Sequence, residues 1–111
     1  MYPLCRLDDL SPGAAHGIEG RFLAIRLIDR VMIYLNACPH LGVPLDWLPG
    51  RFLSADGRVI VCAMHGAEFR LQDGLCLRGP CRGERLTAVP CEVVDGVVMV
   101  PRDWGQTPAA D

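Results

Sequence analysis

The sequence has no lysine and no long hydrophobic run, and each absence reduces the number of possible functions. All 11 basic residues are arginines, and they are scattered along the chain rather than gathered in a stripe. This scatter, with a formal net charge of −2, argues against nucleic acid as a partner. No apolar run approaches the roughly 20 residues of a membrane-spanning helix, so we expect no membrane anchor.

Long helices are also missing from the pattern. The chain has 9 prolines and 12 glycines, and no apolar period of 3.6 residues persists along it. Short apolar runs alternate instead with turn signals, among them Asp56-Gly57, Asp73-Gly74 and Asp95-Gly96. Asp-Gly supplies the positive φ that tight hairpin turns need. The sequence therefore predicts a single all-β domain over residues 1–111, with roughly eight to ten short antiparallel strands.

Two predicted strands lead into the segments that carry chemistry. The apolar runs at residues 21–28 and 31–35 flank Asp29-Arg30, which we predict as a two-residue hairpin turn. The run at 31–35 precedes one Cys/His pair, and the run at 58–61 precedes the other. Loops at strand ends often carry function on a rigid base, so we expect the site there.

Six cysteines in a chain of this length can indicate a secreted disulfide scaffold. Two observations argue against that interpretation. No signal peptide precedes the first expected strand near Leu4. Cysteines paired with histidines also fit metal ligation better than bridging. We therefore expect the protein in the reducing cytoplasm.

The decisive motifs are Cys38-Pro39-His40 and Cys62-Ala63-Met64-His65, separated by residues 41–61. The first pair, two positions apart on an extended loop, can reach different irons of one cluster. The second pair, three positions apart across a turn, can do the same from the opposite side. Thiolates hold iron–sulfur clusters, and replacing two of four by imidazole makes a Rieske centre. Structural zinc is the alternative, because two cysteines and two histidines are also a zinc ligand set.

The two motifs lie in longer segments that resemble a known family. Cys38-Pro39-His40-Leu41-Gly42-Val43-Pro44-Leu45 resembles the first ligand box of Rieske proteins, and Cys62-Ala63-Met64-His65-Gly66-Ala67-Glu68-Phe69 resembles the second. Gly79-Pro80 is similar to the proline loop that shields the cluster in that family. The resemblance runs from about Leu4 to Val100, as in stand-alone Rieske ferredoxins. The boxes are farther apart than in many such ferredoxins, and we place the extra residues around Leu48–Asp56.

The resemblance implies a fold and a cofactor. The fold would be a Rieske-like antiparallel β-sandwich with a small cluster-binding subdomain made of two loops, over approximately residues 38–80. The cofactor would be one [2Fe-2S] cluster per chain, held by Cys38, His40, Cys62 and His65. We expect the cysteines on the inner iron and the histidines on the outer iron, nearer solvent.

The resemblance also separates subtypes. Rieske proteins of respiratory cytochrome complexes add a cysteine after each ligand pair and join the boxes by a disulfide. Here Gly42-Val43 and Met64 occupy those regions, so no such bridge can form. Their second box also supplies a hydroxyl to a cluster sulfide, where this chain has Ala67. Because a hydrogen bond to sulfur stabilises the reduced state, we expect a low potential within the Rieske range.

These features predict a one-electron carrier, a low-potential ferredoxin component of an oxygenase or related redox system. The donor would be a flavin reductase, and the acceptor an oxygenase or a reductase. Two alternatives stay open: a small Rieske subunit of a larger reductase, as in nitrite reductase, and a redox-sensing cluster module. The sequence shows no catalytic base or nucleotide loop, so we do not expect an enzyme that works alone.

The remaining cysteines and the third histidine carry weaker signals. Cys76 and Cys81 are five positions apart, and small buried thiols are favoured there over a regulatory disulfide. Cys5 and Cys91 lie in strand-like runs and are predicted in the core. His16 is predicted in a surface loop rather than at a metal.

Overall fold

The computed structural model describes residues 1–37, 39, 45, 51–62, 66–79 and 81–101. Over these residues it has ten strands and one short 3-10 helix, and every strand pairing is antiparallel. The elements are β1 (Tyr2–Arg6), η1 (Leu7–Asp9), β2 (Ala15–Ile18), β3 (Phe22–Arg26), β4 (Val31–Leu35), β5 (Val59–Cys62), β6 (Ala67–Arg70), β7 (Cys76–Arg78), β8 (Ala88–Val89), β9 (Glu92–Val94) and β10 (Val97–Val100). The all-β antiparallel prediction is confirmed. The described part has no helix long and apolar enough to cross a membrane.

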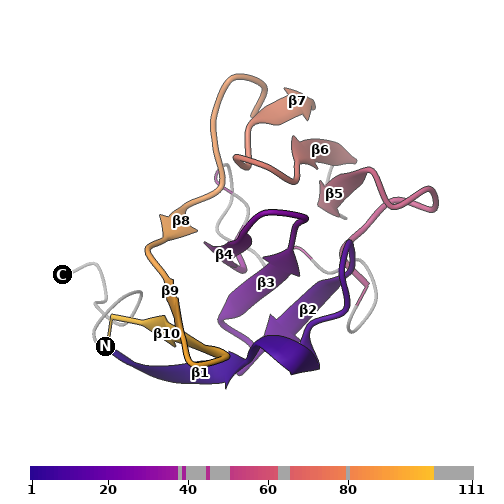
Figure 1. Ribbon diagram of the computed structural model, residues 1–111. Helices are drawn as coiled ribbons and strands as arrows, with labels where there is room; N and C mark the ends of the chain where they lie inside the picture. Colours follow the sequence, from indigo (N-terminus) through magenta and orange to yellow (C-terminus); the bar gives the residue numbers. More distant parts are fainter. Residues whose placement is uncertain (38, 40–44, 46–50, 63–65, 80, 102–111) are drawn as a thin grey trace, which may run out of the picture.

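The strands form three sheets in three levels (Figure 1). One sheet has the order β1-β10-β9, the second β2-β3-β4-β8, and the third β5-β6-β7. The second, here called the central sheet, lies between the other two (Figure 1). The third is here called the cluster sheet, because β5 and β6 flank the second ligand box.

Strand β3 is buried on both of its faces. Successive side chains of a strand point to opposite faces, so its apolar run serves two cores. Phe22 and Ala24 join the core shared with β10, whereas Leu23 and Ile25 join the core shared with the cluster sheet. A run of four consecutive buried apolar residues is therefore what a strand in the middle layer requires.

Tight turns with positive φ join neighbouring strands. Asp95 and Gly96 have φ of 51° and 78° between β9 and β10, so this Asp-Gly pair has the positive φ predicted for a tight hairpin turn. Glu19 and Gly20 have φ of 57° and 69° between β2 and β3. The second turn has the same conformation without an Asp or Asn before its glycine, so composition alone does not signal it.

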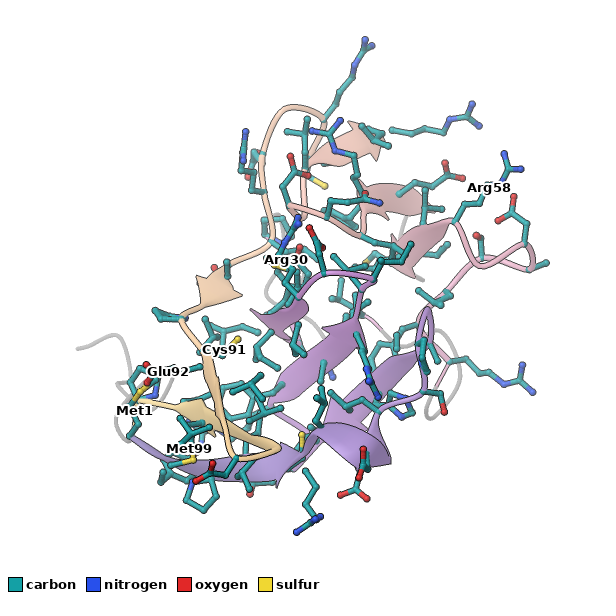
Figure 2. All side chains as sticks on the ribbon, in the orientation of Figure 1. Met1, Arg30, Arg58, Cys91, Glu92 and Met99 are labelled. Carbon is teal, nitrogen blue, oxygen red and sulfur yellow. The ribbon has the colours of Figure 1, made fainter. Side chains whose placement is uncertain are left out.

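The hairpin between β3 and β4 turns one residue earlier than predicted. The Leu27 N–H donates to the Arg30 carbonyl at 2.7 Å, so the turn residues are Ile28 and Asp29 instead of Asp29 and Arg30. Arg30 belongs to the paired end of the hairpin, and its Nη2 donates to the Gln72 carbonyl at 3.1 Å. Figure 2 shows Arg30 at this junction between the central sheet and the cluster sheet.

A buried tyrosine also joins these two sheets. The Tyr34 hydroxyl of β4 donates to the Leu71 carbonyl, just after β6, at 2.8 Å. Burial raises the pKa of Tyr34 to about 12, with a further contribution from the negative charge of Asp73. Burying a hydroxyl is tolerated because its hydrogen bond is made, so this contact fixes how the cluster sheet sits on the central sheet.

Three predictions on single residues change with the structure. His16 lies in strand β2 instead of a loop, and its Nε2 accepts the Ser11 N–H at 3.1 Å. Cys5 and Cys91 are half-buried at the edge of the core, and burial raises the pKa of both thiols. The Cys91 Sγ donates to the Val31 carbonyl at 3.4 Å, beside the central sheet (Figure 2).

Candidate metal centre

The second ligand box begins where strand β5 ends. Cys62 is the last residue of β5, and only 1% of its surface is exposed. It pairs with Ala67, the first residue of β6, and the Gly66 N–H donates to the Cys62 carbonyl at 3.1 Å. Gly66 has a φ of 65°, in the left-handed region that favours glycine. Hydrogen bonding thus fixes both ends of this box in the cluster sheet.

The first ligand box is closed by a side chain that the sequence did not single out. Strand β4 ends at Leu35, and the next residue, Asn36, accepts the Leu45 N–H on its Oδ1 at 2.7 Å. Leu45 is fully buried. One short hydrogen bond therefore ties the two ends of the segment that contains the first Cys/His pair.

Residues of both boxes belong to the same hydrophobic core. Leu45 from the first box and Cys62 and Ala67 from the second belong to one cluster of buried side chains, together with Phe69. Phe69, the last residue of the second box, is fully buried in β6. The described residues of the two boxes therefore meet in one core.

Of the four predicted ligands, the structure places Cys62. Cys38, His40 and His65 lie outside the described residues. Within the described ranges, no three His, Cys, Asp or Glu side chains gather as a metal-binding group. The ligand set as a whole therefore stays a prediction, and the structure supplies the setting of its one described member.

The proline loop contacts the second box. A Cβ added to Gly79 would lie 2.8 Å from the Ala67 Cα and 2.9 Å from its Cβ, so only glycine fits there. The φ of Gly79 is 109°, which also favours glycine. Pro80 lies outside the described residues. Because Ala67 pairs with Cys62, this contact sets the loop directly beside a predicted ligand.

The extra residues between the boxes attach to two sheets. Of the predicted insert, the structure describes residues 51–56, and the Val61 N–H of β5 donates to the Phe52 carbonyl at 2.8 Å. The Phe52 ring packs against Gly17 of β2, where a Cβ would lie 3.0 Å from it. A mostly apolar cleft of about 610 Å³ lies beside it, lined in part by Ala15 and Val61. The insert thus contacts both β5 and strand β2 of the central sheet.

The described surroundings of Cys62 suit a [2Fe-2S] cluster with mixed ligands. None of the buried residues that the structure describes is charged, and the buried Tyr34 hydroxyl has its hydrogen bond made. Two ferric ions, two sulfides, two thiolates and two neutral imidazoles carry a formal charge of about zero, whereas four thiolates would leave a dianion. An apolar core without a compensating cation accommodates the neutral centre at less cost.

Known structures with similar folds include ferredoxins and a complex of a ferredoxin with its oxygenase. The ferredoxin of Sphingomonas yanoikuyae B1 has a TM-score of 0.68 and 22% identity, covering 90% of this chain and 96% of its own. The ferredoxin of carbazole 1,9a-dioxygenase from Nocardioides aromaticivorans IC177 has a TM-score of 0.63 and 27% identity, covering 90% and 97%. A chain in a complex of reduced oxygenase and oxidised ferredoxin of carbazole 1,9a-dioxygenase has a TM-score of 0.65 and 26% identity, covering 88% and 89%. No curated protein matches the sequence.

The sequence itself matches a protein family over most of its length. The profile of the Rieske [2Fe-2S] domain aligns with residues 1–100, which include both ligand boxes and the proline loop. This match decides between the iron–sulfur cluster and structural zinc, the two cofactors that the ligand types allow. The chain therefore belongs to the Rieske [2Fe-2S] domain family, its cofactor is a [2Fe-2S] cluster, and it is an electron carrier.

Proposed function

We propose that this chain is the ferredoxin component of an oxygenase system, receiving single electrons from a flavin reductase and passing them to the oxygenase. The observation that carries the proposal is that Leu45 of the first ligand box and Cys62 of the second belong to the same hydrophobic core. The similar solved structures include a carbazole dioxygenase ferredoxin and a complex of that kind of ferredoxin with its oxygenase. We also propose that residues 1–111 form one domain and that the protein works in the reducing cytoplasm.

In this proposal Cys38, His40, Cys62 and His65 hold the cluster. When bound, the cluster supplies a site for one electron and makes no bonds to a substrate. The chain's own residues hold it in place and keep water from one side. The Asn36–Leu45 hydrogen bond holds the first box, and the contact of Gly79 with Ala67 covers the second.

Electron transfer of this kind needs a rigid centre near the surface. Cys62 is fixed at the end of a paired strand, so little rearrangement would accompany reduction. Histidine ligands on the outer iron would face the partner. Such exchange uses small, transient interfaces, in the lower range of buried area for protein complexes.

We also propose a low reduction potential. Ala67 provides only a methyl group at the position after the His-Gly pair, so it cannot donate a hydrogen bond to a cluster sulfide. Losing such a donor disfavours the more negative reduced state. Protein-film voltammetry should give a midpoint potential toward the low end of the Rieske range. A midpoint well above zero would contradict this part of the proposal.

The central experiment is spectroscopy of freshly, anaerobically purified protein. We expect a red-brown protein that, after reduction with dithionite, gives a rhombic EPR signal with an average g value below that of the free electron. A colourless, zinc-loaded protein would end the proposal.

The electron-transfer role needs a second measurement. Purified, monomeric protein should be reduced by a generic flavin reductase and NADH, and it should then reduce an oxygenase. Tight co-purification with a larger subunit would favour a reductase subunit instead. A cluster that decays on each redox cycle would favour a sensing module.

A further inference from the structure

Cys76 of β7 and Cys81, in the turn that follows this strand, are not predicted ligands, and they form a close pair. The Cys81 Sγ donates to the Cys76 Sγ at 3.0 Å, and the Cys76 Sγ donates in turn to the Arg78 carbonyl at 3.2 Å. Both side chains are buried, with exposed fractions of 2% for Cys76 and 0% for Cys81. The sequence favoured small buried thiols at these positions, and burial is confirmed. Their direct contact was not predicted.

The pair lies at the two ends of the proline loop. Cys76 begins β7, and Cys81 follows Pro80 directly. Backbone hydrogen bonds hold the ends of this region together: the Cys76 N–H donates to the Glu84 carbonyl at 2.8 Å, and the Gly83 N–H donates to the Cys76 carbonyl at 3.2 Å. Between the cysteines, Gly79 packs on Ala67, the partner of Cys62. The two thiols therefore stand at either end of a short segment whose Gly79 contacts the partner of a predicted ligand.

The distance between the two sulfurs is close to that of a disulfide bond. Since a disulfide has an S–S length of about 2.0 Å, the two sulfurs need to approach by only about 1 Å. The close pairing of the ends keeps the local concentration of one thiol near the other high. Small movements of the two side chains would therefore bring the sulfurs to bonding distance.

We propose that Cys76 and Cys81 are a reversible oxidation site, at which a disulfide holds Gly79 against Ala67, beside the predicted ligand Cys62. The oxidant is a small hydroperoxide, because both thiols are buried. One thiolate attacks a peroxide oxygen, the O–O bond breaks, and a sulfenic acid forms with loss of hydroxide or alkoxide. The second sulfur then displaces the hydroxyl group from that sulfenic acid, and the S–S bond forms. With hydrogen peroxide, two thiols yield one disulfide and two waters, and a small dithiol returns the two electrons and two protons.

Burial sets the rate of this reaction. Thiols in apolar surroundings react slowly, so the site responds to sustained exposure to peroxide rather than to brief pulses. The disulfide closes a short covalent ring that contains Gly79, and this ring restricts opening of the loop. The cluster should consequently be lost more slowly from the oxidised pair than from the reduced pair.

The chemistry can be tested on the holoprotein without any partner. Holoprotein is exposed to hydrogen peroxide, the remaining thiols are alkylated under denaturing conditions, and a non-reducing peptide map is recorded. We expect a linked peptide containing Cys76 and Cys81 that disappears after dithiothreitol treatment. Cys91→Ser, at a half-buried thiol outside the cluster sheet, is the matched control and should keep the link. Sulfinic or sulfonic acid at either cysteine without a linked peptide would overturn the proposal.

The second measurement follows the cluster. Bleaching of the visible absorbance by an iron chelator should be slower by about threefold or more in the disulfide form than in the dithiol form. Cys81→Ser should lose this difference while keeping its colour. Equal bleaching rates in the two wild-type forms would overturn the locking role, and that comparison needs no variant. Because it uses only coloured, isolated protein, failure of the proposed electron partners leaves this test unaffected.

Discussion

The two cores on either side of the central sheet are built in different ways. The core facing β1-β10-β9 consists of aliphatic residues and one phenylalanine: Leu10, Phe22, Ala24, Val31, Ile33, Val89, Val98 and Val100. The core facing the cluster sheet adds Cys62, Cys76, Cys81 and the hydrogen-bonded Tyr34. The stability of the first core depends on how much apolar surface it buries. The second core also contains sulfur atoms and a hydroxyl group that make specific contacts. Substitutions should therefore reduce stability in the first core and alter the cofactor region in the second.

The largest effect should come from removing a predicted ligand. Cys62→Ser replaces a soft thiolate with a hydroxyl, so we expect loss of the cluster and of the visible colour. Iron and sulfide content and the EPR signal of the reduced protein measure this. Cys91→Ser, the control, should keep both. A Cys62→Ser protein with a full complement of iron and sulfide would remove Cys62 from the ligand set.

The proline loop offers a matched pair of glycines. Gly79 and Gly83 both have positive φ, at 109° and 91°, but only at Gly79 would a Cβ collide with another backbone, at Ala67. We expect Gly79→Ala to lower the free energy of unfolding by about 3 kcal/mol and Gly83→Ala by about 1 kcal/mol. Chemical denaturation measures both. Only Gly79→Ala should speed cluster loss to a chelator, and equal effects would mean that the Ala67 contact has no special role.

A substitution in the other core should affect stability alone. Val98 of β10 is fully buried, and Val98→Ala removes apolar volume from the core that contains neither Leu45 nor Cys62. We expect the free energy of unfolding to fall by about 2 kcal/mol. The EPR spectrum of the folded variant should match that of the wild type. A changed spectrum would show that the two cores are coupled.

The smallest effect concerns the hydrogen bond between the central and cluster sheets. Tyr34→Phe removes the donor to the Leu71 carbonyl and should lower the free energy of unfolding by about 1 kcal/mol. The folded pKa of Tyr34 is raised to about 12 from an ordinary value of 10.0. The stabilisation is therefore fully present below pH 10.0 and is lost as the pH rises toward 12. Unfolding measured at neutral pH and near pH 11 should show the advantage over Tyr34→Phe shrinking; a constant difference would contradict this.

Local patterns predicted the strands well, because alternation and turn chemistry act over a few residues. Asp95-Gly96 takes the predicted turn geometry since its two residues tolerate positive φ. The hairpin after β3 was misplaced by one residue, because the register that pairs Arg26 with Val31 sets the turn, and that register depends on packing between the strands. His16 was missed as a strand residue because its segment has little β-branched character, and pairing with β3 determines its conformation.

The site was predicted as a set of ligands but not as an arrangement. Resemblance to Rieske boxes predicted four ligand positions and a proline loop. It did not reveal the Asn36–Leu45 hydrogen bond, the packing of Gly79 on Ala67 or the contact of Cys76 with Cys81. Each of these joins groups whose separation is set by tertiary packing. No periodicity or composition encodes them, so the structure is needed to find them.

Strand β3 has a consequence for anyone who wishes to transplant the redox module. Its alternate side chains pack into two different cores, so both cores depend on this one strand. A minimal graft of β5-β6-β7 into a foreign scaffold would leave Leu45 and Cys62 without the Leu23 and Ile25 surface on which their core is closed. The smallest portable unit therefore includes β3 and β4 as well as the two boxes.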